Sequence, residues 1–168
     1  MQDKLIRRIA LKNALKVSIE QGQIEVVYQP IITLDTNKIA KLEALARWQY
    51  EGDFISPDEF IPLAEEFGLI YKLGLLVLRK ACHTLKLLKG LGWNDIAINV
   101  NRSVKEFEPD DCAKDWIAIL KEFDLQGKDI NFELTESILA PEQKSNLEKL
   151  ASLQKNGSKI SLDDFGTG

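Results

Sequence analysis

The stretch INFELT, residues 130–135, indicates the class of fold, because its apolar and polar side chains alternate with a period of two. This alternation is typical of a β-strand that turns one face to a hydrophobic core. The same pattern recurs in LEALARW (42–48), IAINVN (96–101) and KISLDD (159–164). In each of these four segments one face is apolar and suited to covering helices, while the other carries an acid or an amide.

Helical segments separate these four strands along the chain. The expected helices cover residues 69–89, 103–123 and 141–155, and the second begins at a capping-box pattern formed by Ser103 and Glu106. Strands that alternate with helices pair in parallel through right-handed crossovers. The sequence therefore predicts an α/β fold.

The N-terminal part departs from this alternation. Residues 24–32 and 38–48 are both rich in β-forming residues and are separated by a short turn, so they are expected to form an antiparallel hairpin. Ser56 and Pro57 predict the start of a short helix. Residues 1–22 are expected to form an N-terminal helix or a linker, ahead of one domain at residues 23–168.

The polar strand faces admit two explanations. A parallel sheet covered on both sides is normally apolar throughout, so either this sheet turns one face to water or something neutralises its acids. The second explanation predicts a hard-cation site, because the side chains offer oxygen ligands that suit Mg²⁺ or Mn²⁺ rather than Zn²⁺. Two such ions about 3.5–4 Å apart would clamp a phosphodiester. The candidate ligands are Glu43, Asn99, Glu133 and Asp163, with Asp164 for a second ion.

Composition excludes several other classes. The chain has 168 residues, 45% hydrophobic, and a net charge of −4, which argues against a disordered chain and against duplex nucleic-acid binding. It contains no apolar run long enough for a membrane span and no signal peptide, so a cytoplasmic location is expected. Cys82 and Cys112 are too isolated for a zinc site or a disulfide framework. His83 is the only histidine, which excludes mechanisms that need two.

Taken together and in order, the motifs resemble those of the EAL domain, a family of cyclic di-GMP phosphodiesterases. The resemblance spans residues 24–168 and is specific because all the motifs occur in the family's order. The matching motifs are Tyr28-Gln29-Pro30, Glu43-Ala44-Leu45, Pro57 with Phe60-Ile61 and Ala64-Glu65, Asn99-Val100-Asn101, Glu133-Leu134-Thr135-Glu136-Ser137 and Asp163-Asp164-Phe165-Gly166-Thr167-Gly168.

The resemblance implies a modified (β/α)8 TIM-like barrel with an antiparallel first hairpin, here incomplete after about five strands. It also implies metal-dependent hydrolysis of cyclic di-GMP to linear pGpG, with two Mg²⁺ or Mn²⁺ ions as cofactors. Glu136 is expected to fix the loop that begins at Asp163. By resemblance the catalytic residues are Glu43, Asp163 and Asp164, the metal ligands Glu43, Asn99, Glu133, Asp163 and Asp164, and the substrate contacts Gln29, Glu43, Leu45 and Arg47.

Some features depart from the family pattern. Asn101 stands where Ser is usual and Ala46 where Leu is common, and the later motifs, a catalytic Lys and a Glu, are absent. Residues 1–168 alone are therefore expected to be inactive, whether they are a fragment, a natural short chain or a degenerate product. Two alternatives stay open: a receptor that binds cyclic di-GMP without cleaving it, and a dimerisation module that pairs through the exposed edge at residues 159–164, as a homodimer.

Overall fold

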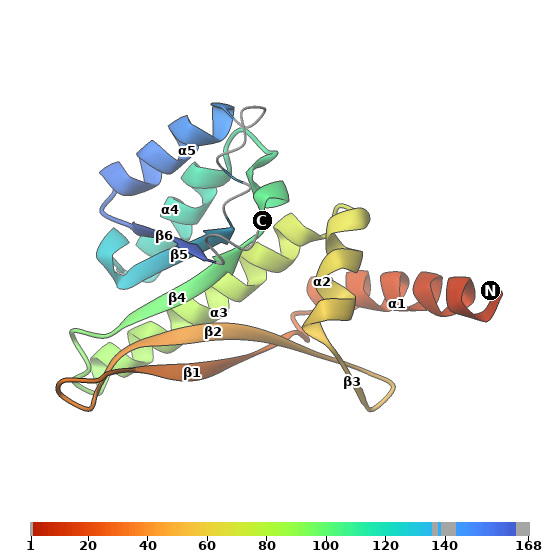
Figure 1. The fold of residues 1–168 in the computed structure, drawn as a ribbon, viewed down its shortest axis with the longest axis horizontal. Helices are drawn as coiled ribbons and strands as arrows, with labels where there is room; N and C mark the ends of the chain where they lie inside the picture. The colour runs from red at the N-terminus through yellow and green to blue at the C-terminus, as the bar shows by residue number, and fades with distance from the viewer. Residues whose placement is uncertain (1, 136–137, 139–143, 164–168) are drawn as a thin grey trace.

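A computed structural model describes residues 2–135, 138 and 144–163 (Figure 1). Within these residues, helices and strands alternate after an N-terminal helix and a hairpin. The elements in chain order are α1 (Gln2–Glu20), β1 (Glu25–Thr33), β2 (Lys38–Tyr50), β3 (Asp53–Ile55), α2 (Pro57–Glu66), α3 (Ile70–Gly90), β4 (Ala97–Arg102), the 3-10 turn η1 (Val104–Phe107), α4 (Cys112–Glu122), the 3-10 turn η2 (Gly127–Asp129), β5 (Ile130–Thr135), α5 (Lys144–Lys155) and β6 (Lys159–Asp163).

One mixed sheet organises the described residues, with the strand order β1-β2-β4-β5-β6. β1 and β2 pair antiparallel, which confirms the predicted hairpin, and β2, β4, β5 and β6 run parallel to one another. The α/β class and the strand-helix order predicted from the sequence are therefore confirmed. Within the described part of the chain, β1 and β6 form the two open edges of this sheet.

The helices cover one face of the sheet. In Figure 1, α3 lies along β2 and β4, while α4 and α5 lie beside β5 and β6. Most of the apolar strand positions predicted to face helices on β4 and β5 are buried, among them Val100 and Phe132 with no exposed surface, whereas Leu162 of β6 is 38% exposed. The buried positions join buried side chains of α3 and α4, such as Leu78 and Trp116, in one hydrophobic cluster. Burial of this apolar area is the main stabilising contribution to the fold.

The N-terminal helix packs on this core through one stripe of side chains. Leu11 and Leu15 of α1 are buried, and the hydroxyl of Ser18 accepts a hydrogen bond of 3.0 Å from the indole Nε1 of Trp48. Both partners of that bond are buried, so it ties α1 to β2. The outward side of α1 is exposed and includes Leu5 and Ile9.

One predicted helix was wrong, and one strand was not predicted. The helix expected over residues 103–123 is divided into η1 and α4, because Pro109 lies between them and a proline lacks the N–H that a continuous helix would use. Ser103 and Glu106 do form the predicted capping box, but it caps the 3-10 turn. The sequence prediction also missed β3, a three-residue strand that pairs antiparallel with the end of β2.

Within the described residues, no helix combines the length and the apolar character that crossing a membrane requires.

Candidate functional site

The polar face of the sheet opposite the helices brings the predicted acids and amides together. The backbone register sets Glu43 of β2 beside Asn99 of β4, and Asn101 of β4 beside Glu133 of β5. These residues are distant in sequence, yet they lie on neighbouring strands and on the same face because side chains alternate along each strand. Of the four residues predicted to converge, Glu43, Asn99 and Glu133 thus lie on three adjacent strands.

Hydrogen bonds connect these side chains into two groups, which together form the polar network of this face. Asn101 donates from Nδ2 to Oε1 of Glu43 at 2.9 Å, and Asn99 donates from Nδ2 to Oε1 of Glu133 at 2.6 Å. Asn99 in turn accepts at Oδ1 from Nδ2 of Asn131, at 3.2 Å. Asn131 also exchanges hydrogen bonds with the hydroxyl of Ser161 on β6. One group therefore joins β2 to β4, and the other joins β4, β5 and β6.

The half-buried carboxylates of Glu43 and Glu133 form a candidate cation site. Asn99 and Asn131 are 3% and 2% exposed, and Glu43 and Glu133 are half-buried. Within the described residues Glu43 pairs with a neutral amide rather than with a cationic side chain. A neutral partner leaves the carboxylate charge unbalanced, and carboxylate and amide oxygens are the ligands that Mg²⁺ and Mn²⁺ prefer. The donor set thus fits a hard cation.

The remaining predicted ligands cannot be added to this site. Asp163 ends β6, where its backbone pairs with that of Thr135, but its side chain lies outside the described residues, as do Asp164 and Glu136. Among the described side chains, no group of three or more His, Cys, Asp or Glu is placed to hold a metal ion. The described part of the predicted metal set is therefore Glu43, Asn99 and Glu133.

The predicted substrate contacts lie beside this network. Gln29 of β1 is the register partner of Glu43 and is exposed on the antiparallel hairpin. Leu45 and Arg47 follow Glu43 on the same face of β2, two and four residues further along, and both are half-buried. The Arg47 guanidinium donates from Nη1 to the carbonyl oxygen of Ala46 at 2.8 Å. Its other donors can contact an anion.

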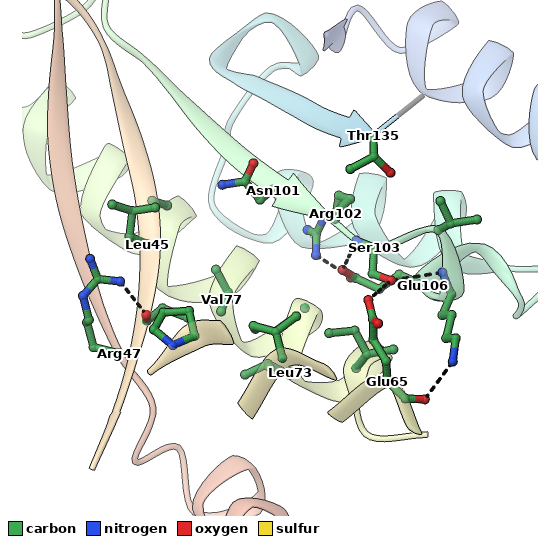
Figure 2. Close-up of a pocket in the computed structure, with 18 residues that line it drawn as sticks. Leu45, Arg47, Glu65, Leu73, Val77, Asn101, Arg102, Ser103, Glu106 and Thr135 are labelled. Carbon is green, nitrogen blue, oxygen red and sulfur yellow. Dashed lines mark hydrogen bonds and ion pairs between the residues drawn. The ribbon is translucent and has the colours of Figure 1, made fainter. Parts of the chain in front are cut away.

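A cavity of about 480 Å³ adjoins Leu45 and Arg47, at the end of β4 and between β2 and helices α2 and α3. Figure 2 shows Leu45 and Arg47 on one side, Leu73 and Val77 from α3, and Asn101 nearby. The lining is mostly apolar, with charged groups at the margin. Such a lining suits a ligand that has flat apolar parts and anionic groups, because a few placed polar groups orient a ligand in an apolar pocket.

The chain matches one known family of domains. The family model described as EAL domain matches residues 12–168 of the chain. The chain belongs to the EAL domain family.

Relatives of this EAL domain include proteins of named activity. It is 37% identical over 170 residues to the uncharacterized protein y4lL of Sinorhizobium fredii, covering 100% of this chain and 20% of that protein. It is 36% identical over 169 residues to the probable cyclic di-GMP phosphodiesterase PdeB of Escherichia coli K12, covering 98% of this chain and 32% of that protein. The chain thus spans between a fifth and a third of the length of these two relatives.

Solved EAL structures share the fold. The structure of the PaMucR phosphodiesterase in complex with c-di-GMP is 33% identical, with a TM-score of 0.88, over 95% of this chain and 65% of that chain. The structure of the EAL enzyme Bd1971 in its cGMP-bound form is 27% identical, with a TM-score of 0.89, over 99% of this chain and 47% of that chain. The predicted TIM-like architecture of the EAL domain is therefore confirmed at the level of the fold.

The sequence analysis missed a buried ion pair at the margin of the EAL cavity. Arg102, the last residue of β4, donates from Nη1 to Oε2 of Glu106 at 2.8 Å, and the two side chains are 0% and 3% exposed. Burial raises the pKa of Glu106, and the nearby Arg102 charge opposes that rise. The signal was present in the sequence, because period-two alternation places Arg102 on the apolar face with Val100 and the capping box already singled out Glu106.

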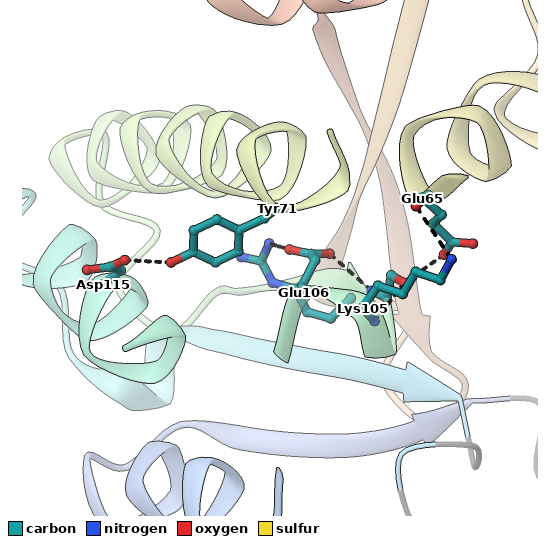
Figure 3. Close-up of polar contacts among 7 residues, drawn as sticks. Glu65, Tyr71, Lys105, Glu106 and Asp115 are labelled. Carbon is teal, nitrogen blue, oxygen red and sulfur yellow. Dashed lines mark hydrogen bonds and ion pairs between the residues drawn. The ribbon is translucent and has the colours of Figure 1, made fainter. Parts of the chain in front are cut away.

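The ion pair belongs to a chain of contacts that reaches α2. Glu106 also accepts from the backbone N–H of Ser103 at 3.0 Å, and the Ser103 hydroxyl donates to Oε1 of Glu65 at 2.6 Å. Figure 3 shows Glu106 at the centre of this chain, with Glu65 and Lys105 beyond it. On the far side, the hydroxyl of Tyr71 donates to Asp115 at 2.5 Å, and burial together with this bond raises the pKa of Tyr71.

Proposed function

We propose that the EAL domain to which this chain belongs hydrolyses cyclic di-GMP to linear pGpG with the help of Mg²⁺ or Mn²⁺. The observation that carries the proposal is the juxtaposition of Glu43, Asn99 and Glu133 on three adjacent strands, next to an apolar cavity that Arg47 adjoins. Relatives named as phosphodiesterases of this dinucleotide support it, as does the c-di-GMP complex of PaMucR.

In this proposal Glu43, Asn99 and Glu133 would hold one ion, and Asp163 with Asp164 would complete its site and hold a second. The ions would supply Lewis-acid polarisation of the phosphodiester and a water of lowered pKa as nucleophile. Asn99 now donates its amide N–H to Glu133 and accepts from Asn131 at its oxygen, so a half-turn that presents this oxygen instead would require the Asn131 amide to turn as well. Asn131 limits the position of that amide through its bond to Asn99.

The chain's own residues would bind and orient the dinucleotide. Arg47 would pair with a phosphate through two parallel hydrogen bonds, since a guanidinium matches that geometry. Leu45 would contact the ligand from the same strand, and Gln29 would donate or accept at its other side. The apolar walls of the cavity would exclude water from the ligand's flat parts.

The activity is proposed for a complete EAL domain. This chain matches 65% of the PaMucR chain. Residues 1–168 on their own are expected to be inactive, because the family's later motifs, a Lys and a Glu, are absent from them.

The experiment compares the complete domain with a chain of residues 1–168. Each is incubated with cyclic di-GMP and Mn²⁺, and chromatography follows the linear dinucleotide; Mn²⁺ binding is titrated separately by calorimetry. Glu43→Gln should lower turnover by at least about 100-fold, because it removes a charged ligand whose stabilisation amounts to several kcal/mol. Glu148→Gln, on the exposed side of α5, is the matched control and should leave turnover unchanged.

The result also separates the alternative functions. A complete domain that binds cyclic di-GMP but releases no linear product, with or without Mn²⁺, would identify a receptor. A complete domain that neither binds nor cleaves the dinucleotide would overturn the proposed function.

A homodimer is a second proposal, carried by the two open sheet edges. Within the described residues β1 pairs only with β2, and β6 only with β5. Exposed strand edges template pairing with another chain, and exposed Ile31 and Ile32 lie on β1. Sedimentation velocity should detect a dimer, and a monomer at every concentration tested would contradict the proposal.

A further inference from the structure

Arg102 occupies a position where packing alone calls for an apolar residue. It follows Ile98 and Val100 on the face of β4 that meets the helices, and both of these are fully buried. Its guanidinium lies over two aromatic rings, 4.5 Å from the centroid of Trp116 and 5.3 Å from that of Phe132. Among the described residues, Nε and Nη2 of this arginine find no hydrogen-bond partner.

Such an arrangement is poorly explained by stability. Two charges taken out of water lose hydration that their mutual attraction recovers only with good geometry and further hydrogen bonds. Here two guanidinium nitrogens meet ring faces instead of acceptors. Apolar residues of similar volume at Arg102 and Glu106 would fill the same space without that cost, so the ion pair points to a role other than packing.

The ion pair restrains the chain directly after the polar residues of β4. Arg102 is the residue directly after Asn101, whose side chain binds Glu43 on the opposite face of β4. Glu106 holds Arg102 with one oxygen and the backbone N–H of Ser103 with the other, which closes the turn after the strand. Ser103 then ties this turn to α2 through Glu65.

Helix α3 is pressed against the same pair. A methyl group at Gly74 would lie 2.6 Å from Nη1 of Arg102 and from Cδ of Glu106, so only a glycine fits there. The pair is therefore enclosed by α3 at Gly74 and by the rings of Trp116 and Phe132. The guanidinium of Arg102, enclosed on these sides, therefore has little freedom to move.

We propose that Arg102 and Glu106 are positioning residues, which hold the carboxyl end of β4 so that the amides of Asn99 and Asn101 face Glu133 and Glu43. The pair acts through the strand that Arg102 terminates. This inference deepens the proposed function, because the site that it positions is the one assigned there to cyclic di-GMP.

The test replaces the pair by apolar residues of similar size, Arg102→Met with Glu106→Leu, in the complete EAL domain. Nitrogen-15 NMR then follows the side-chain amide signals of Asn99 and Asn101, and calorimetry measures cyclic di-GMP binding. Positioning predicts a melting temperature equal to or above that of the unaltered protein, loss of the dispersed shifts of both amides, and binding that is about 10- to 100-fold weaker.

Two further variants serve as controls. Arg79→Met with Glu122→Leu makes the same exchange in an exposed ion pair between α3 and α4, with side chains 48% and 50% exposed, and should move neither the amide signals nor the affinity. Glu106→Gln keeps one acceptor oxygen and replaces the other by an amide donor, so it can accept from Arg102 or from the Ser103 N–H as placed but not from both, and both readouts should fall between those of the unaltered protein and the double variant.

The outcomes decide between positioning and packing. Unchanged Asn99 and Asn101 signals in the folded double variant would overturn the inference. Should that variant fail to fold, Arg102→Lys replaces it: this keeps a cation but loses the planar fork, so the same loss of signals is expected and its absence overturns the inference. If the unaltered domain does not bind cyclic di-GMP, the proposed function is wrong, but the positioning role is still tested by the amide signals of Asn99 and Asn101.

Discussion

Replacing Gly74 with alanine tests how tightly α3 packs on the buried ion pair. In an open helix this change adds about 1 kcal/mol of stability, because alanine is the better helix former. At Gly74 the new methyl would lie 2.6 Å from Nη1 of Arg102 and closer still to Oε2 of Glu106. Neither atom belongs to a flexible exposed side chain, since the two residues are 0% and 3% exposed.

The expected cost follows from these contacts. Overpacking a well-filled interior costs about 1–3 kcal/mol, and moving one partner of a buried ion pair adds to that figure, since losing a partner outright costs about 3–5 kcal/mol. After the gain in helix propensity, a net loss of about 2 kcal/mol is expected for Gly74→Ala. In a chain of this length that corresponds to a melting temperature about 4–8 °C lower.

The assay is urea unfolding followed by far-ultraviolet circular dichroism, with Gly90→Ala as the matched control. Gly90 ends the same helix, and a methyl there would meet no atom within 4 Å, so that variant should equal the unaltered protein or gain about 0.4–1 kcal/mol. Equal stability of the two variants would refute the reasoning, since it would mean that α3 does not approach the ion pair as described.

Three further outcomes are expected. Arg47→Ala should weaken cyclic di-GMP binding by the complete domain about 10- to 100-fold in calorimetry, the value of a hydrogen bond to a charged group, while unchanged binding would remove Arg47 from the site. Ser18→Ala should lower the free energy of unfolding by about 1–3 kcal/mol, because it leaves the buried indole N–H of Trp48 without its acceptor; urea titration measures this, and an unaffected midpoint would contradict it. Burial raises the pKa of Cys82 to about 12 and also raises that of Cys112, so both thiols stay protonated at pH 8 and should react with a thiol reagent only after unfolding. Because the folded state holds the proton of Cys82 more tightly than the unfolded state does, the contribution of Cys82 to stability is complete below pH 9 and is lost as the pH rises towards 12. The variant Cys82→Ala should lessen this loss of stability at high pH.

The local part of the fold could be predicted from the sequence because its determinants are close in the chain. Period-two alternation marked β4, β5 and β6, and it assigned the acids and amides to one face, since neighbouring side chains on a strand must point in opposite directions. The short turn between β1 and β2 predicted their antiparallel pairing. Local cues failed where two signals competed: the capping box at Ser103 predicted a long helix, but Pro109 interrupts it after one turn.

The candidate site was predictable as a set of residues but not as a set of contacts. Alternation placed Glu43, Asn99 and Glu133 on one face, and the motif order named the family. Which side chains touch depends on strand register, and register arises only when the strands pair: Asn99 bonds to Glu133 and Asn101 to Glu43, links across 34 and 58 residues of sequence.

What the sequence by itself determined is therefore the alternation of strands and helices along the chain, the polar face and the oxygen-only character of its candidate ligands, because each follows from residue type and spacing. What only the tertiary structure decided is the environment of Arg102. In the sequence, this charged residue only interrupts the apolar face of β4. In the structure, Glu106, Trp116 and Gly74 surround it. These neighbours come from three separate elements, and the energy of a buried charge depends on what surrounds it in space rather than on what precedes it in the chain.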